Sequence, residues 1–254
     1  MEQIYTIPVN EAFDASAAEP SCGCPLCAIH RKFEDNELEL ILGASMMEPD
    51  IRIMTNKQGF CRTHYDMMFV RKNRLGMALT LESHLDELRN EIEDGKLTAM
   101  MGGAGSSARK RLEEHEDSCY VCKRTAYHFD HVLETVVLLA IENGDAMQIA
   151  QTDENFRKKF SMQPYFCLPH YRLLLEYGKK KLSKKQNSDF ARDCADIVLP
   201  YFDELRKDVS WFCKKFDYRY PDEPWYNSKD AVERAINFLR GDLHMKPGDG
   251  GKKG

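Results

Sequence analysis

Hydrophobic residues recur at intervals of three and four positions along most of this chain. The first long example follows Cys27, where apolar side chains at these intervals form one stripe: Ile29, Phe33, Leu38, Ile41 and Leu42. Such spacing is typical of an amphipathic α-helix packed against a core. Gly43 follows the last apolar position, and we expect the helix to end there.

The same periodicity predicts further helices, which are separated by glycine, proline and asparagine. We expect them at residues 49–54, 62–70, 75–92, 122–143, 145–160, 168–177, 188–216 and 229–240. A kink is expected near Pro200, because proline removes a backbone hydrogen bond from a helix. Ser228 is expected to cap the last helix and Gly241 to end it. No segment alternates apolar and polar residues for long enough to predict a strand, so the sequence predicts an all-α fold.

Cysteine and histidine stand at two-residue spacing in four short motifs. In chain order they are Cys24 and Cys27, Cys61 and His64, Cys119 and Cys122, and Cys167 and His170. A Cys-x2-Cys pair presents two thiolates from one turn, and a Cys-x2-His pair at the start of a helix adds two donors, which completes a tetrahedral shell. We therefore expect two metal sites, one formed by the first four residues and one by the last four.

The repeated motifs predict two helical pseudo-repeats that share a core. Cys119 follows Cys24 by 95 residues and Cys167 follows Cys61 by 106, so about eleven residues are added in the second half. Asp94 and Gly95, followed by the glycines and serines at 102–107, are the strongest breaker signals. We expect an irregular arm at 1–21 that lies partly on the body, a first module at 22–101, a linker at 102–112, a second module with the C-terminal helix at 113–246 and a disordered tail at 247–254.

Zinc is the metal that these motifs favour. Mixed sulfur and nitrogen donors at two-residue spacing are typical of zinc sites, whereas iron–sulfur clusters more often take four cysteines and stay the alternative. Three cysteines and one histidine leave no open coordination position for water. Closed shells of this kind usually stabilise structure, so we expect both sites to be structural.

Composition narrows the class of protein further. Hydrophobic residues make up 43% and charged residues 30% of the chain, which are ordinary globular values. A net charge of −5 makes nucleic acid an unlikely partner, although the lysines between 179 and 185 form a basic cluster. No secretory signal and no membrane-spanning run is recognisable, so a cytoplasmic location is expected. In a reducing compartment nine cysteines indicate metal or redox chemistry rather than disulfides.

Two further groups of residues are candidates for chemistry. Cys22 stands two residues before Cys24 and offers a fifth thiol beside the first site, whereas Asp117 occupies the equivalent position in the second half. It is either a free surface thiol or a reactive one. His128, His131 and Glu134 follow each other at three-residue spacing on one predicted helix, which suggests a weaker second constellation for a metal or for acid–base chemistry. The alternative is that these residues lie on a solvent-exposed face of the helix, where the same spacing is common.

The chain resembles an uncharacterised family of bacterial cytoplasmic proteins, classed only as a domain of unknown function. The resemblance rests on both pairs of motifs and on three segments that extend it over nearly the whole chain: the opening at 4–9, the aromatic stretch at 215–225 and the helix start at 227–230. It implies a bacterial origin and a duplicated Cys-x2-Cys and Cys-x2-His helical module. It supplies no substrate.

Two hypotheses for function follow from these observations. The first is a zinc-binding interaction or regulatory module whose partner, a protein or a small molecule, is unknown. The second is a redox or thiol-dependent metalloenzyme that uses Cys22 beside the first site, or an iron–sulfur cluster in place of zinc. The sequence leaves open whether any catalysis occurs.

Overall fold

A computed structural model describes residues 3–102, 106–141, 156–220 and 222–242. Helices and turns account for this part of the chain, and no strand occurs within it, which confirms the all-α prediction. The α-helices are α1 (Thr6–Ala18), α2 (Pro25–Leu42), α3 (Pro49–Gln58), α4 (Arg62–Val70), α5 (Arg74–Met100), α6 (Ser106–Glu116), α7 (Tyr120–Ile141), α8 (Phe156–Ser161), α9 (Leu168–Lys181), α10 (Lys184–Lys214) and α11 (Ala231–Arg240).

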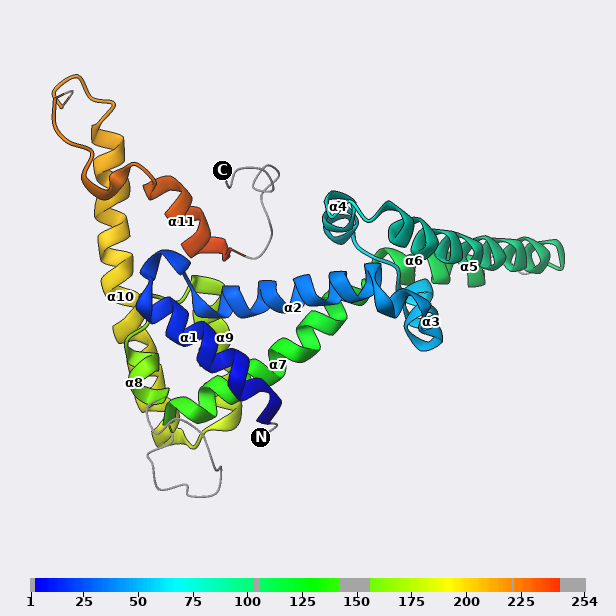
Figure 1. Ribbon diagram of the computed structural model, residues 1–254, viewed down its shortest axis with the longest axis horizontal. Coiled ribbons are helices and arrows are strands. Elements are labelled where there is room, and N and C mark those ends of the chain that lie inside the picture. Colours follow the sequence, from blue (N-terminus) through cyan, green and yellow to red (C-terminus); the bar gives the residue numbers. More distant parts are fainter. Residues whose placement is uncertain (1–2, 103–105, 142–155, 221, 243–254) are drawn as a thin grey trace. The chain divides into compact units, whose positions relative to one another are not determined.

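The helices form two compact units (Figure 1). Unit 1 holds the described residues of Met1–Arg31 and Phe129–His244, and unit 2 holds Lys32–His128. The boundaries fall inside α2 and inside α7, so the units do not coincide with the two halves of the sequence repeat.

The N-terminal segment of unit 1 is a helix and not the irregular arm that the sequence predicted. Pro8 lies in the first turn of α1, where its missing N–H group would have no helical partner anyway, so it is compatible with the helix. Phe13 of α1 is fully buried, and its ring lies 5.0 to 6.1 Å from three other phenylalanine rings: those of Phe156, Phe160 and Phe166. The expectation that the segment lies on the body is confirmed by this burial.

The other side of unit 1 is built from α9, α10 and α11. Ser183 caps α10 in a capping box with Gln186, and the helix continues through Pro200 to Lys214. The ring of Tyr165 stacks on that of Tyr201 at 4.0 Å between centroids. Ser228 does not cap α11 as predicted, because it lies in the short 3-10 turn Tyr226–Ser228 and its hydroxyl donates to the carbonyl of Trp225.

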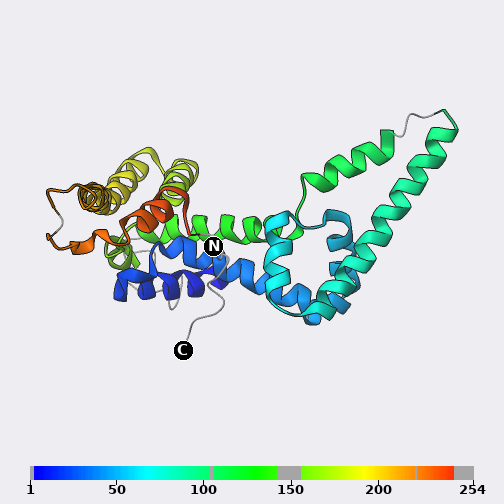
Figure 2. The same cartoon turned by 90° about the horizontal axis from the view of Figure 1, so that it is seen from above.

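Unit 2 has its own apolar core. The core joins side chains of α2, α4 and the start of α7 with the segment before α4: Leu38, Ile41, Leu42, Phe60, Met67, Met68, Cys119, Tyr120 and Val121. In the same unit α3, α5 and α6 contact one another, and α5 is the long teal helix of Figure 2.

The predicted linker at 102–112 is largely helical, because α6 begins at Ser106. Gly95, which the sequence indicated as a break, lies inside α5, and a Cβ atom there would overlap the side chain of Ala108. The glycine therefore allows α6 to approach α5 closely.

Some expectations fall outside the described residues. These are the helix end near 143, most of the segment 145–160 and the tail at 247–254. Among the residues that are described, no helix is long and apolar enough to cross a membrane.

Candidate metal centres

Four of the eight motif residues meet inside unit 1, and we call this group quartet 1: Cys24, Cys27, Cys167 and His170. Cys24 directly precedes α2 and Cys27 lies in its first turn, while Cys167 is the N-cap residue of α9 and His170 lies in its first turn. A proline at the start of each helix fixes the backbone without loss of a helical hydrogen bond. Quartet 1 is thus built from two facing helix N-termini.

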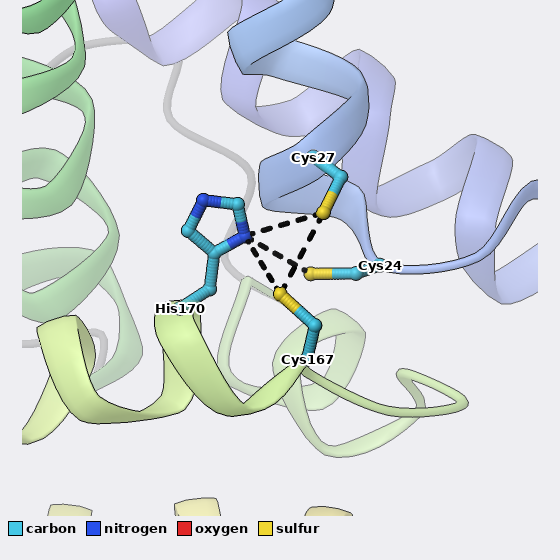
Figure 3. A group of neighbouring side chains, drawn as sticks. All are labelled: Cys24, Cys27, Cys167 and His170. Atoms are coloured by element: carbon cyan, nitrogen blue, oxygen red, sulfur yellow. Dashed lines mark hydrogen bonds between the residues drawn. The ribbon is translucent and has the colours of Figure 1, made fainter. Parts of the chain in front are cut away.

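The donor atoms of quartet 1 point toward a common centre (Figure 3). The imidazole Nδ1 of His170 lies 3.6, 3.4 and 3.2 Å from the sulfur atoms of Cys24, Cys27 and Cys167, and the last two sulfurs are 3.6 Å apart. Zinc–sulfur and zinc–nitrogen bonds at tetrahedral angles imply separations of about 3.6 Å between sulfur and nitrogen and about 3.8 Å between sulfurs. The four residues therefore fit one tetrahedral ion.

Burial is the largest influence on the pKa of Cys24 and of His170 in quartet 1. It raises the pKa of Cys24 to about 12 and lowers the pKa of His170 to about 3, where His30 adds a smaller repulsion. Both effects disfavour the charged forms of these groups. Three thiolates buried at these positions would require a cation to neutralise them. The backbone N–H of Asp242 donates to the sulfur of Cys27 at 3.4 Å, which further stabilises negative charge there.

The other four motif residues meet inside unit 2, and we call them quartet 2: Cys61, His64, Cys119 and Cys122. Cys61 is the N-cap residue of α4 with His64 in the first turn, and Cys119 precedes α7 with Cys122 in its first turn. The backbone N–H of Tyr120 donates to the carbonyl of Gly59 at 3.0 Å, so a direct hydrogen bond holds the start of α7 to the segment before α4. Quartet 2 therefore repeats the construction of quartet 1.

Quartet 2 also has tetrahedral spacing, but it is more open to solvent. The Nδ1 atom of His64 lies 3.1, 3.2 and 3.5 Å from the sulfurs of Cys61, Cys119 and Cys122. The sulfurs of Cys61 and Cys122 are 3.9 Å apart. Cys119 and His64 are buried, whereas Cys61 is half-buried and Cys122 is exposed.

Glu34 supports quartet 2 from behind His64. Its carboxylate lies 2.8 Å from Nε2 of His64, and each of the two side chains is only 2% exposed. Although burial opposes the charged imidazole, hydrogen bonds with Cys119 and Glu34 raise the pKa of His64 to about 10. A carboxylate that accepts from a ligating histidine fixes its orientation and increases its basicity. Sequence reasoning missed Glu34, because it is one of several acidic residues on α2 and nothing in their spacing distinguishes it.

The pairing of the motifs is crossed relative to the sequence prediction. We expected Cys24 and Cys27 to share an ion with Cys61 and His64, but the first Cys-x2-Cys pair meets the second Cys-x2-His pair, and the second meets the first. The expected pairing within each half is therefore wrong. Its physical reason is the unit boundary after Arg31, because the start of α2 belongs to unit 1 while α4 belongs to unit 2.

Cys22 lies beside quartet 1 on a cavity of about 950 Å³ in unit 1. The residue is exposed, and Cys24 and Cys27 also line the cavity. Charged side chains of both signs surround it: Arg31, Glu204, Lys229, Asp230, Arg234 and Asp242. The fifth thiol thus faces a space large enough for a small molecule next to two ligands of quartet 1.

The weaker constellation is not brought together by the structure. His128, His131 and Glu134 are absent from the groups of converging ligands among the described residues. Each side chain contacts a different residue instead: in chain order, Glu37, the ring of Tyr5 and Lys181. These contacts account for the three positions without a shared ion.

Comparison with known proteins finds a match to a family model. A family described as a family of unknown function, DUF6062, matches residues 1–246. Neither the curated proteins nor the solved structures contain a match to this chain.

Proposed function

The chain belongs to this family of unknown function, and from its two quartets we propose that it is a zinc-binding helical protein with two structural metal sites. Each site would hold two helix N-termini at a fixed separation. The protein as a whole would act as an interaction or regulatory module for a protein or small-molecule partner.

One observation carries this proposal: all eight motif residues converge, and they converge in two groups of three cysteines and one histidine. The measured separations match a tetrahedral ion bound to sulfur and nitrogen, the coordination that zinc prefers. A filled shell leaves no position for a reacting water molecule. The metal would therefore contribute to folding free energy and leave chemistry to other groups.

Elemental analysis of protein purified under nitrogen tests the proposal directly. We expect two zinc ions per chain and a colourless solution. Removal of zinc with a strong chelator should lower the melting temperature, because the binding free energy of a structural site is part of the stability of the fold. Protein that contains no metal, or that keeps its melting temperature after the metal is removed, would contradict the structural role.

A second candidate function is favoured by the cavity beside Cys22. Its exposed thiol and two ligands of quartet 1 line the same space, which suits a thiol-dependent or redox metalloenzyme, with an iron–sulfur cluster in quartet 1 as one form of it. A brown solution with broad visible absorption and stoichiometric iron would support the cluster. Zinc in quartet 1, together with alkylation of Cys22 no faster than that of the exposed Cys213, would remove this candidate.

A further inference from the structure

The two quartets share one donor set and differ in their access to solvent. In quartet 1 the three cysteines are between 0% and 3% exposed: Cys24, Cys27 and Cys167. In quartet 2 Cys122 is exposed and Cys61 is half-buried. Oxidation of cysteine requires thiolate character and contact with the oxidant. Cys24 and Cys27 line the cavity beside Cys22 but expose almost no surface, so oxidation should be faster in quartet 2.

The two accessible thiolates of quartet 2 are also neighbours. Their sulfur atoms lie 3.9 Å apart, and the shift to the roughly 2.05 Å of a disulfide requires side-chain movement of about 2 Å. Quartet 1 provides an internal comparison, because the sulfurs of Cys27 and Cys167 lie at the similar distance of 3.6 Å but are both buried. Distance alone would allow either pair to form a disulfide, and exposure distinguishes between them.

Charge around quartet 2 also favours attack by its sulfurs. A zinc ion and three thiolates carry a net charge of about −1, and the carboxylate of Glu34, which contacts His64, adds a further negative charge. Negative charge close to a thiolate makes its sulfur a better electron donor. Backbone N–H groups donate to Cys27 in quartet 1 and to Cys119 in quartet 2, and each withdraws electron density from the sulfur that accepts it.

We propose that Cys61 and Cys122 form an oxidation site at which a peroxide converts the two zinc-bound thiolates into a disulfide and releases the zinc ion of quartet 2. The inference rests on the proposed zinc sites and adds regulation to one of them. Quartet 1 keeps its ion under the same conditions. The protein then exists in a fully loaded form and in a form with zinc in quartet 1 alone.

The reaction balances with hydrogen peroxide as the oxidant. The thiolate of one cysteine attacks a peroxide oxygen, the O–O bond breaks, and a sulfenic acid and hydroxide result. The second thiolate then attacks the sulfenic sulfur, and the S–S bond forms as a second hydroxide leaves. Two protons from the buffer convert both hydroxides into water, so two thiolates lose two electrons and one peroxide gains them. Quartet 2 retains Cys119 and His64, which are too few ligands to hold the ion tightly.

The test uses full-length, zinc-loaded protein that carries Cys22→Ser and Cys213→Ser, so that the exposed thiols outside quartet 2 cannot react. Hydrogen peroxide is added, and released zinc is followed with a chromophoric chelator while the free thiols are counted. Peptide mapping then locates the disulfide. We expect one zinc ion released for each two thiols lost, a Cys61–Cys122 linkage, and release from quartet 2 roughly tenfold or more faster than from quartet 1.

Three outcomes would overturn the inference. They are equal rates of zinc loss from both quartets, a disulfide that excludes Cys61 or Cys122, and full zinc retention at a peroxide concentration that oxidises Cys22 in the unsubstituted protein. Because no ligand is substituted, a folding defect cannot imitate any of them. Absence of zinc from the starting protein would instead refute the proposed function, so the two failures are distinguishable. Recovery of the fully loaded form after addition of a reductant and zinc completes the test.

Discussion

The crossed pairing of the motifs makes a prediction that separates it from pairing within each half. Cys27→Ser removes one ligand from quartet 1. If His170→Ala is added, the same quartet is damaged twice, whereas addition of His64→Ala damages both quartets. Under pairing within each half these two results would be exchanged. Comparison of the two double variants therefore distinguishes crossed pairing from pairing within each half.

The size of the effect follows from the four ligands of each quartet. Structural zinc sites bind with roughly 10–16 kcal/mol of apparent free energy at neutral pH. An equal share among four ligands assigns about 2.5–4 kcal/mol to each, which corresponds to a loss in affinity of roughly 10²- to 10³-fold. Two ligands lost from one quartet should interact non-additively, because a half-dismantled shell no longer holds the ion. Two ligands lost from different quartets should act independently.

Competition with chelators of graded affinity measures both outcomes through the zinc content at equilibrium. We expect Cys27→Ser with His170→Ala to retain about one zinc ion per chain at full affinity. Cys27→Ser with His64→Ala should weaken both ions. Cys213→Ser, which removes an exposed cysteine outside the quartets, is the matched control and should bind as the unsubstituted protein does. Retention of one tightly bound ion in the variant with His64→Ala would refute the crossed pairing.

Three more substitutions test the surroundings of the quartets and the core. Glu34→Ala should lower the zinc affinity of quartet 2 about 10- to 100-fold by removing the carboxylate behind His64, and unchanged chelator competition would contradict this. Burial lowers the pKa of His84 below the 6.5 of an exposed imidazole. The stability contributed by the neutral side chain is therefore present above about pH 6.5 and is lost as the pH falls. Denaturation at several pH values should show a smaller loss of unfolding free energy at low pH in His84→Gln than in the unsubstituted protein. Phe13→Ala should cost about 3–5 kcal/mol of unfolding free energy, whereas the exposed Tyr218→Ala should cost almost nothing.

Local features of the fold were predictable from the sequence because local forces decide them. The apolar stripe that follows Cys27 predicted α2 and its end at Gly43 correctly, since a helix that buries one face must repeat apolar residues at that spacing. Glycine was less informative, because Gly95 serves the close approach of two helices rather than a break. The same residue type fits both roles, and only the packing partner, Ala108, distinguishes them.

The sequence allowed the ligand residues of the candidate sites to be predicted, but not which motifs share an ion. Spacing of two residues reveals which donors share a helix turn, because the turn itself sets that geometry. Which turns meet depends on tertiary packing, and the division inside α2 separates Cys27 from Cys61 although they are only 34 positions apart. Glu34 could not be predicted for the same reason: its role exists only once His64 is placed beside it.

The crossed connectivity sets up a competition while the chain is being synthesised. Cys24 and Cys27 emerge with Cys61 and His64 as the first available partners, long before Cys167 and His170, which are about 140 positions away. Closure of the shorter loop costs roughly 1 kcal/mol less in chain entropy. A nascent chain that binds zinc early therefore favours the non-native site formed by Cys24, Cys27, Cys61 and His64. Native assembly then requires Cys119 and Cys122 to replace Cys24 and Cys27 as ligands of that ion. Zinc added after synthesis of the chain is complete should therefore give native protein faster than zinc that is present from the start of synthesis.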